Sequence, residues 1–273
     1  GRQFAYPPVP RNAPADAMAR GSRAVGLTVT DAPAAVLSRD REAGTTPYRM
    51  ACVNCGACHQ GCRTGAKGGA DNSFLPMASA NGATIIANAR AIGVERDAGG
   101  RIKCVIYRRD GQDHRLNCRA LFLCAGGVET PRLLHLSSSS LFPDGLANSS
   151  GLVGRNYMRH MTGSVYAQFD KPVNMHRGTT CAGVISDESY NDPSRGFVGG
   201  YRLEILALGL PFLSAFLDPT PKGWGRQFAS RMEKYNHMSG VWLCGEDLPL
   251  ESNRITLHAT EKDQYGLPFP VVT

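Results

Sequence analysis

Four cysteines lie within eleven residues of this 273-residue chain, and they constrain its fold more than any other feature: Cys52, Cys55, Cys58 and Cys62. Their spacing, C-x2-C-x2-C-x3-C, is typical of bacterial ferredoxin loops, in which closely spaced thiolates on a turning backbone bind the irons of a cluster. Gly56 and Gly61 permit such a turn. We therefore predict a metal site, an iron–sulfur cluster that uses three or four of these thiols as ligands.

Other interpretations of the cysteine run stay open. In ferredoxins a proline usually follows the fourth cysteine, whereas here Arg63 follows Cys62 and no second array of cysteines exists. Zinc fits the spacing less well, because two zinc knuckles normally need a longer spacer, but a zinc-stabilised structural domain remains an alternative. The thiols could also be simply buried, or paired as disulfides, in a compact loop. His59, inside the run, is a further candidate for tuning or ligating a cluster.

Composition excludes several classes of protein. Hydrophobic residues make up 42% of the chain and charged residues 19%, which is ordinary for a soluble globular protein. No apolar run approaches the roughly 20 residues of a membrane span, and the longest, 203–216, contains Glu204 and Pro211. The net charge of +7 is scattered and does not form the basic stripe that nucleic-acid binding needs. The total of nine cysteines is odd, which argues against a disulfide framework, so the five dispersed ones are expected to be small buried residues.

Hydrophobic periodicity and turn residues predict the order of the elements. Residues 1–50, rich in Pro, Ala and Arg, are expected to form a cover segment that has neither a signal-peptide core nor a natural start. Helices are predicted over 14–25, 73–82, 128–137 and 222–238. Strands are predicted over 84–96, 103–110, 114–124, 163–169, 179–186 and 198–208. Within these, the apolar run 121–124 is expected to be a buried strand.

A strand, a glycine turn and a helix are predicted in direct succession around residues 121–137. Gly126 and Gly127 would let the backbone approach a phosphate or ribose, and a helix N-terminus favours negative charge. Thr130 is expected to cap the helix and Pro131 to occupy its first turn. A bare Gly-Gly pair at such a turn is a weak sign of a nucleotide site, because a purely structural turn looks the same.

Several segments in order resemble the middle of a glucose–methanol–choline (GMC) flavoprotein oxidoreductase. They are the cysteine-to-GAK loop running into 73–76, then 88–95 with 124–134, then 147–160, and finally 251–270. The branch they resemble most comprises bacterial glucose, gluconate and fructose dehydrogenases. The resemblance implies an α/β (α+β) fold: part of a Rossmann-like FAD-binding domain plus a sheet-and-helix substrate lobe. In those terms residues 1–50 are a connecting segment, 51–160 belong to the FAD domain with its Cys-rich loop, 161–250 form the substrate lobe, and 251–273 are its return strand.

The resemblance also implies cofactor-binding residues. Ala91 would lie against the adenine of FAD, Ala125 and Gly126 would contact its ADP part, and Thr130 would open the helix packed below. The loop 65–75 would run near the flavin, with Lys67 and Asp71 as its polar members.

Asn156 and His160 stand in the family motif Gly-Arg-Asn-Leu-x-Asp-His beside the cofactor. Tyr157 replaces the Leu of that motif and Arg159 replaces the Asp, so local packing is expected to differ. The family's Ser-Gly-x-Gly after the helix is a looser run of serines at 137–140.

Two parts of the family pattern are not found in these residues: the first G-x-G-x-x-G unit and the last segment with its catalytic histidines. We expect an internal piece of a longer protein, with catalytic residues unknown and no turnover by the piece alone. The resemblance implies that a histidine base accepts the alcohol proton while FAD accepts a hydride from an alcohol, sugar or sugar acid. The cluster would then pass electrons to a haem or quinone subunit. Relatives suggest a periplasmic or membrane-associated location only by analogy.

Two other functions fit the same residues. One is a long-chain alcohol or sterol oxidase, in which a related cysteine loop need not hold a cluster. The other is a non-catalytic cofactor-binding or electron-transfer subunit that completes its fold with another chain. Iron and acid-labile sulfide content separates the first from a cluster enzyme, and a continuous reading frame with the flanking motifs removes the second.

Overall fold

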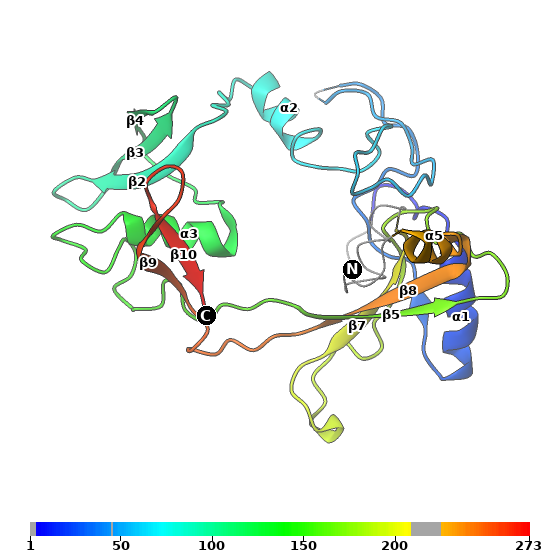
Figure 1. Cartoon of the computed structure of the whole chain (residues 1–273). Helices are drawn as coiled ribbons and strands as arrows, with labels where there is room; N and C mark the ends of the chain where they lie inside the picture. The colour runs from blue at the N-terminus through cyan, green and yellow to red at the C-terminus, as the bar shows by residue number, and fades with distance from the viewer. Residues whose placement is uncertain (1–3, 45, 209–224) are drawn as a thin grey trace. The chain divides into compact units, whose positions relative to one another are not determined.

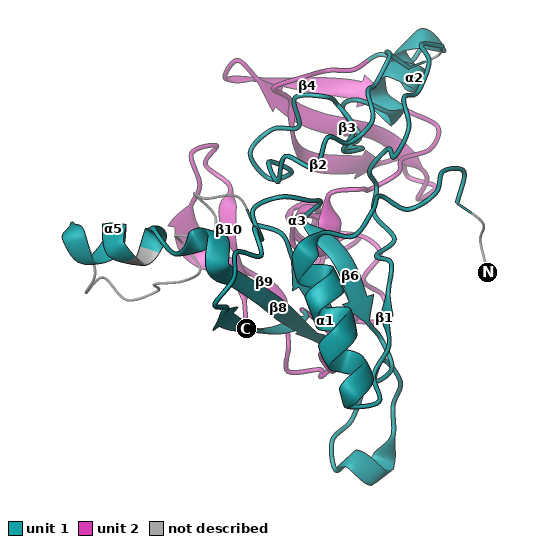
Figure 2. Cartoon of the chain, turned by 90° about the vertical axis from the view of Figure 1, so that its right-hand side faces the viewer, with its two compact units in different colours: residues 1–84, 160–246 teal, residues 85–159, 247–273 magenta. Residues whose placement is uncertain are grey.

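The computed structural model describes residues 4–44, 46–208 and 225–273, and Figure 1 shows the order of its elements. The chain forms two compact units, coloured separately in Figure 2. The first unit comprises residues 1–84 and 160–246, and the second comprises residues 85–159 and 247–273. Each unit is therefore built from two separate stretches of sequence. The assignment of these stretches to a cofactor domain and a substrate lobe stays a prediction.

The first unit is built on a five-stranded antiparallel sheet in the order β1-β6-β7-β8-β5. Its strands are β1 (Val29–Thr30), β5 (Met161–Gln168), β6 (Cys181–Ile185), β7 (Tyr201–Leu206) and β8 (Met238–Gly245). The other elements among the described residues of this unit are α1 (Ala13–Ala24), α2 (Phe74–Ala80), η1 (Pro193–Arg195), α5 (Arg226–Met232) and η2 (Tyr235–His237).

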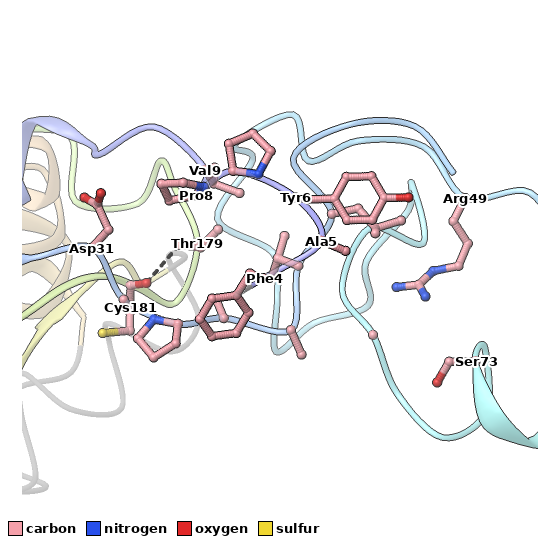
Figure 3. Close-up of a pocket in the computed structure, with 18 of the residues that line it drawn as sticks. Phe4, Ala5, Tyr6, Pro8, Val9, Asp31, Arg49, Ser73, Thr179 and Cys181 are labelled. Carbon is pink, nitrogen blue, oxygen red and sulfur yellow. Dashed lines mark hydrogen bonds between the residues drawn. The ribbon is translucent and has the colours of Figure 1, made fainter. Parts of the chain in front are cut away.

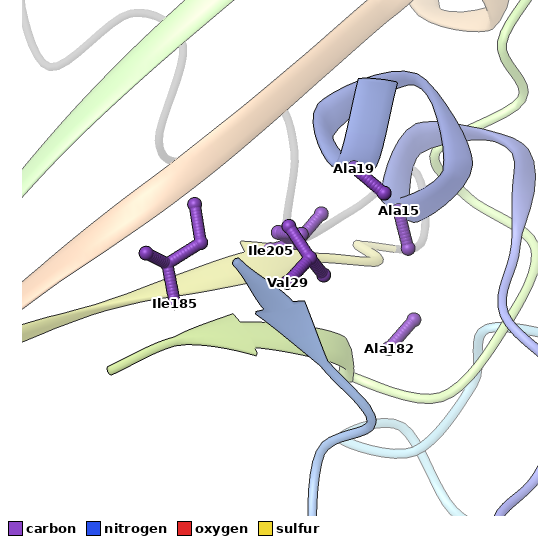
Figure 4. Packing of buried hydrophobic residues seen from close by; sticks show 6 residues of the cluster. All are labelled: Ala15, Ala19, Val29, Ala182, Ile185 and Ile205. Carbon is purple, nitrogen blue, oxygen red and sulfur yellow. The ribbon is translucent and has the colours of Figure 1, made fainter. Parts of the chain in front are cut away.

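Both faces of this sheet carry buried side chains. On one face, Ala15 and Ala19 of α1 pack with residues of β1, β6 and β7, as Figure 4 shows: Val29, Ala182, Ile185 and Ile205. Successive residues of a strand point to opposite faces. Leu206, the residue after Ile205, accordingly belongs to a second cluster with Met175 and Leu208.

Local sequence explains α1. Asn12 caps the helix, because its side-chain oxygen accepts a hydrogen bond of 3.1 Å from the backbone N–H of Ala15. Pro14 lies in the first turn, where a missing N–H costs nothing. Two alanines one turn apart then let the helix approach the sheet closely. The predicted helix over 14–25 is confirmed.

The second unit combines a three-stranded meander, a helix and a hairpin. The meander is β2 (Arg90–Arg96), β3 (Ile102–Arg109) and β4 (Gln112–Asn117), and the hairpin is β9 (Ile255–Lys262) and β10 (Pro268–Val272). Asp110 and Gly111, both with positive φ, form the two-residue turn between β3 and β4. Helix α3 (Gly126–Leu136) contributes Leu133 to a core with Val94 and Leu146.

Most predicted elements are found, and the fold is of the mixed α/β class that was expected. Three details of the prediction are wrong. The first strand of the meander begins at Arg90 rather than at residue 84. The run 121–124 is not a strand: Leu121 and Leu123 pack on the core, but Phe122 is 88% exposed and no described strand pairs with it. Helix α3 begins at Gly126, so Thr130 is not its cap and Pro131 lies inside it.

Two predictions fall partly on residues that are not described. Of the apolar run 203–216, residues up to 208 are described and include buried Ile205, Leu206 and Leu208, whereas 209–216 lie outside the described residues. Of the helix predicted over 222–238, residues 222–224 lie outside as well; the rest forms α5, the short η2 turn and the start of β8. Among the helices of the described residues, none has the length and apolar character to cross a bilayer.

Candidate functional site

The cysteine loop is fixed to two other segments of the first unit. The backbone N–H of Cys52 donates a hydrogen bond of 2.8 Å to the carbonyl of Leu37. Cys55 pairs with Gly178 in an isolated parallel bridge, and the N–H of Gly178 donates to the carbonyl of Asn54 at 3.0 Å. Gly56 packs so closely against the carbonyl of His176 that no side chain fits there. These contacts, rather than the cysteines, determine the course of the loop.

Two of the thiols accept hydrogen bonds from backbone amides. Cys62 Sγ accepts from the N–H of Lys67 and Cys52 Sγ from the N–H of Asn54, both at 3.4 Å. Burial alone would raise the pKa of Cys62, but the amide of Lys67 and the hydroxyl of Thr64 together hold that pKa below its usual value. Burial raises the pKa of Cys52. The charges of the other three loop thiols raise it further, so the four sulfurs lie within electrostatic range of one another.

The thiols do not meet as a set of metal ligands. Among the described residues, no group of three or more His, Cys, Asp or Glu side chains is arranged to hold a metal ion. All nine cysteines are free thiols, so the disulfide alternative is not realised either. Cys58 and His59 instead line a cavity of about 300 Å³ in the first unit, together with Lys67. The structure therefore brings the four cysteines into one loop without forming a site from them.

The loop 65–75, predicted to run near a flavin, is held by hydrogen bonds to its own backbone and by Arg49. Arg49 is only 6% exposed and donates from Nε to the carbonyl of Gly65 at 2.7 Å and from Nη2 to that of Ala66 at 3.0 Å. Asn72 Nδ2 donates to the carbonyl of Lys67 at 2.9 Å. The side chains of Lys67 and Asp71 are exposed on this ordered loop. Sequence reasoning missed Arg49, which stands in no motif.

The same loop forms one wall of a cavity of about 760 Å³ in the first unit (Figure 3). Residues 68–70, Ser73 and Phe74 line it from the loop side. The rest of the wall comes from residues 4–9 and 31–37, from Arg49, and from Thr179, Cys181 and Ala182. No motif of the sequence marks this cavity, because its walls come from segments that are far apart in the chain.

The glycine turn in the second unit leaves backbone exposed at the start of a helix. Ala125 and Gly126 are exposed, and Gly126 has a φ of +82°, a conformation that favours glycine. A β-carbon at Gly126 would meet nothing within 4 Å, so the space in front of the turn is open. Thr130 Oγ1 accepts a hydrogen bond of 3.2 Å from the N–H of Ala125. Thr130 thus closes the turn onto α3 instead of capping the helix.

Ala91 lies near this turn. It follows Arg90 on β2, and Arg90 forms an ion pair with Glu129 in the first turn of α3. Ala91 and Leu123 also pack against the same core cluster. The structure therefore brings Ala91, Ala125 and Gly126 into one region of the second unit.

Asn156 lies in a bend of the second unit that is held from both sides. Its φ of +56° is in the left-handed region, which Asn tolerates better than most residues. Arg155 bridges to Arg254 in a short antiparallel contact, and Asn253 Nδ2 donates to the carbonyl of Tyr157 at 3.1 Å. His160 belongs to the first unit and is exposed.

The site residues therefore fall into two sets. Lys67, Asp71 and the cysteines belong to the first unit. Ala91, Ala125, Gly126, Thr130 and Asn156 belong to the second. Their roles toward a cofactor stay predictions.

Comparison with known proteins identifies the family. A family model described as GMC oxidoreductase matches residues 16–162. A 2-methyl-1,2-propanediol dehydrogenase of Mycolicibacterium austroafricanum is 32% identical over 246 residues, which cover 86% of this chain and 43% of that protein. The fructose dehydrogenase large subunit of Gluconobacter japonicus is 33% identical over 204 residues, 70% of this chain and 36% of that protein. A long-chain-alcohol oxidase of Arabidopsis thaliana is 26% identical over 230 residues, which cover 78% of this chain and 29% of that protein.

The chain thus spans less than half the length of these relatives. The match nevertheless includes the cysteine run, the loop 65–75, the glycine turn and the motif around Asn156. Most of the segments on which the sequence resemblance was based thus occur in one continuous match, and the segment 251–270 lies outside it. The chain belongs to the GMC oxidoreductase family.

Proposed function

We propose that this chain is the cofactor-proximal part of an FAD-dependent oxidoreductase that oxidises the CH–OH group of an alcohol or sugar. The observation that carries the proposal is the family match over residues 16–162. The named relatives act on a diol, on fructose and on long-chain alcohols, which supports the general class of substrate without selecting one.

The residues of the second unit fit the ADP half of FAD. The open space in front of Gly126 and the exposed backbone of Ala125 allow the close approach that an adenosine diphosphate needs. The first N–H groups of α3 favour an anion. In this proposal Ala91 flanks the adenine, and Thr130 keeps the turn in shape through its bond to Ala125. Asn156 lines the cofactor from the bend at 155–157.

In the first unit, Lys67 and Asp71 are proposed to face the flavin. Their loop is ordered by Arg49 and Asn72, so both charges are presented from a defined backbone. FAD, when bound, supplies the hydride acceptor. The chain's own residues orient the cofactor and place charged groups beside it, and we assign no base among them.

An iron–sulfur relay to a haem or quinone subunit is the finer form of this proposal. The spacing of the four cysteines supports it, and the amide hydrogen bonds to the sulfurs of Cys52 and Cys62 favour thiolates there. Their arrangement does not fit, because the thiols do not converge on a common point among the residues described. We therefore derive no electron-transfer step through them. Iron and acid-labile sulfide in the purified full-length protein, absent after Cys58→Ser, would establish the cluster.

Flavin content and reduction test the main proposal. The purified full-length protein should release FAD on denaturation, and an alcohol or sugar added anaerobically should bleach the flavin absorbance. Gly126→Val should lower FAD content, because it places bulk in front of the turn. Gly111→Val is the matched control: Gly111 also has positive φ and open space, but lies at the turn between β3 and β4. A protein without FAD refutes the proposal, and one that binds FAD but is reduced by no alcohol or sugar is a non-catalytic subunit.

A further inference from the structure

The cavity of about 760 Å³ in the first unit has the size of a small-molecule site. Most of its wall is apolar: residues 4–9 contribute two aromatic rings, two prolines and a valine, and residues 32–37 contribute three alanines, a proline, a valine and a leucine. Figure 3 shows Phe4 between the side that carries Thr179 and the side that carries Arg49, with Pro8 and Val9 above Thr179.

Most polar side chains of the wall already have protein partners. Asp31 forms an ion pair with Arg11, with 2.6 Å between Oδ1 and Nε. Thr179 Oγ1 donates to the carbonyl of Cys181 at 3.0 Å, and Ser73 Oγ donates to the carbonyl of Gly69. Asp31 still offers its Oδ2 as an acceptor, but three groups with these partners serve few of the hydroxyls of a sugar.

Two hydrogen-bond donors of the wall also retain capacity. Arg49 uses Nε and Nη2 for the carbonyls of the loop, which leaves the Nη1 donors of its guanidinium. The hydroxyl of Tyr6 forms no bond within the described part of the chain, and in Figure 3 it lies on the side where Arg49 is. The cavity therefore offers donors on the side of Arg49, the ion-paired Asp31 on the opposite side, and mostly apolar walls between them.

We propose that this cavity binds the apolar body of the alcohol substrate, so that the enzyme prefers aliphatic alcohols to sugars. This inference rests on the proposed function. The cavity is a candidate for the substrate because residues 68–70 and Ser73 belong to the loop that also carries Lys67 and Asp71, the residues proposed to face the flavin.

Apolar walls favour an aliphatic chain and penalise a sugar. A sugar would lose the water bound to most of its hydroxyls without gaining protein partners, whereas each buried methylene gains affinity. That gain is about fourfold per methylene, the equivalent of about 0.8 kcal/mol. An alcohol with its oxygen on the side of Arg49 and its chain against Phe4 and Val9 satisfies both parts of the wall.

Substrate kinetics of the full-length flavoprotein test the inference. With a dye acceptor, kcat/KM should rise about fourfold per added methylene from 1-butanol to 1-hexanol. Glucose and fructose should be at least about 100-fold poorer than 1-hexanol, since three or four methylenes correspond to that factor. The tertiary alcohol 2-methyl-2-hexanol has no hydrogen on its carbinol carbon, so it should bind without reacting and inhibit competitively.

Variants of the cavity wall test whether this cavity causes the preference for aliphatic alcohols. Ala34 and Ala35 line the cavity and are exposed, so Ala34→Phe and Ala35→Phe should fold and reduce its volume. Each should lower kcat/KM for 1-hexanol about tenfold or more and weaken the tertiary alcohol equally. Ala98→Phe is the matched control: it adds the same ring to an exposed alanine in the turn between β2 and β3 and should change neither value.

Other outcomes overturn the inference. A higher kcat/KM for a sugar, no dependence on chain length, or alanine variants that behave like Ala98→Phe would each show that the cavity does not hold the substrate. If no alcohol or sugar reduces the flavin, the proposed oxidation fails. Calorimetry with 2-methyl-2-hexanol then still decides the cavity: binding weakened by Ala35→Phe supports an apolar ligand there, and no binding overturns it.

Discussion

Replacing Asp263 by asparagine should loosen the hairpin β9–β10. Asp263 is 13% exposed, and its Oδ2 lies 2.7 Å from Nη2 of Arg132, whose side chain is 3% exposed. Its other oxygen accepts hydrogen bonds from the backbone N–H groups of Tyr265 at 2.8 Å and Leu267 at 3.1 Å. One carboxylate thus closes the turn of the hairpin and pairs with a buried guanidinium of α3.

The free-energy cost of each variant depends on which interactions of Asp263 it removes. Removing one partner of a buried ion pair costs about 3–5 kcal/mol when the other charge is left alone. Here Glu129 remains 3.3 Å from Arg132, and an asparagine oxygen still accepts the turn bonds, so Asp263→Asn should cost about 2 kcal/mol. Asp263→Ala also loses two turn bonds of about 1 kcal/mol each and should cost about 4 kcal/mol.

Hydrogen–deuterium exchange of the peptide covering residues 255–272 measures this effect locally. In the full-length protein, a loss of about 2 kcal/mol corresponds to exchange about 30-fold faster. Asp110→Asn is the control, because Asp110 pairs with Arg109 on the exposed side of the same unit and should change exchange little. Equal acceleration by Asp263→Asn and Asp263→Ala would show that the turn hydrogen bonds contribute nothing beyond the ion pair. No acceleration by either variant would show that neither interaction stabilises the hairpin.

Burial would raise the pKa of Asp263, but the bonds from Arg132 and the two amides hold it below the usual value. The unfolded carboxyl therefore binds a proton more readily than the folded one. The pair contributes its full stability above about pH 4, and protection of the hairpin should fall as the pH decreases further.

Three other predictions concern the first unit. Gly56→Ala should displace the cysteine loop and speed its proteolysis, because the new β-carbon would overlap the carbonyl of His176. Gly61→Ala is the control: Gly61 also has a positive φ, but its new β-carbon would meet nothing within 4 Å. It should cost only backbone strain of about 1 kcal/mol. Burial, and secondarily the charge of Arg177, lowers the pKa of His176, so the unfolded imidazole binds a proton more readily than the folded one. Thermal stability should therefore decline below about pH 6.5, and His176→Phe should remove part of that decline. Burial and then the charge of Glu204 raise the pKa of Cys181 to about 11, so iodoacetamide at pH 8 should modify it far more slowly than exposed Cys55; equal rates, by mass spectrometry, would contradict this.

Local signals predicted the elements whose formation is decided locally. The helix predicted over 14–25 and the strand predicted over 103–110 were found, and a few adjacent residues bound them: Asn12 caps the helix, and Asp110 and Gly111 form the turn after the strand. The start of α3 was misplaced because Thr130 and Pro131 are good first-turn residues anywhere. Here Gly126, with its positive φ, starts the helix earlier, and Thr130 instead accepts the N–H of Ala125.

The run 121–124 shows why strands are harder to predict than turns. Its apolar residues predict burial, and Leu121 and Leu123 do pack on the core. Phe122 and Cys124 point out, and no strand of the described chain pairs with the run. A strand exists only when another segment supplies its hydrogen bonds, and the composition of four residues cannot say where that partner is.

Motifs identified the family because membership depends on short segments that keep their order. The proposed substrate cavity depends on a different kind of information. Its wall is assembled from residues 4–9, 31–37, 68–70, 73–74 and 179–182 without Thr180, together with Arg49, which stands in no motif. None of these segments predicts a cavity alone, since its walls exist only after the chain folds. If the cavity holds the substrate and the glycine turn holds the cofactor, as proposed, substitutions at Ala34 and Ala35 should change specificity and leave FAD content unchanged.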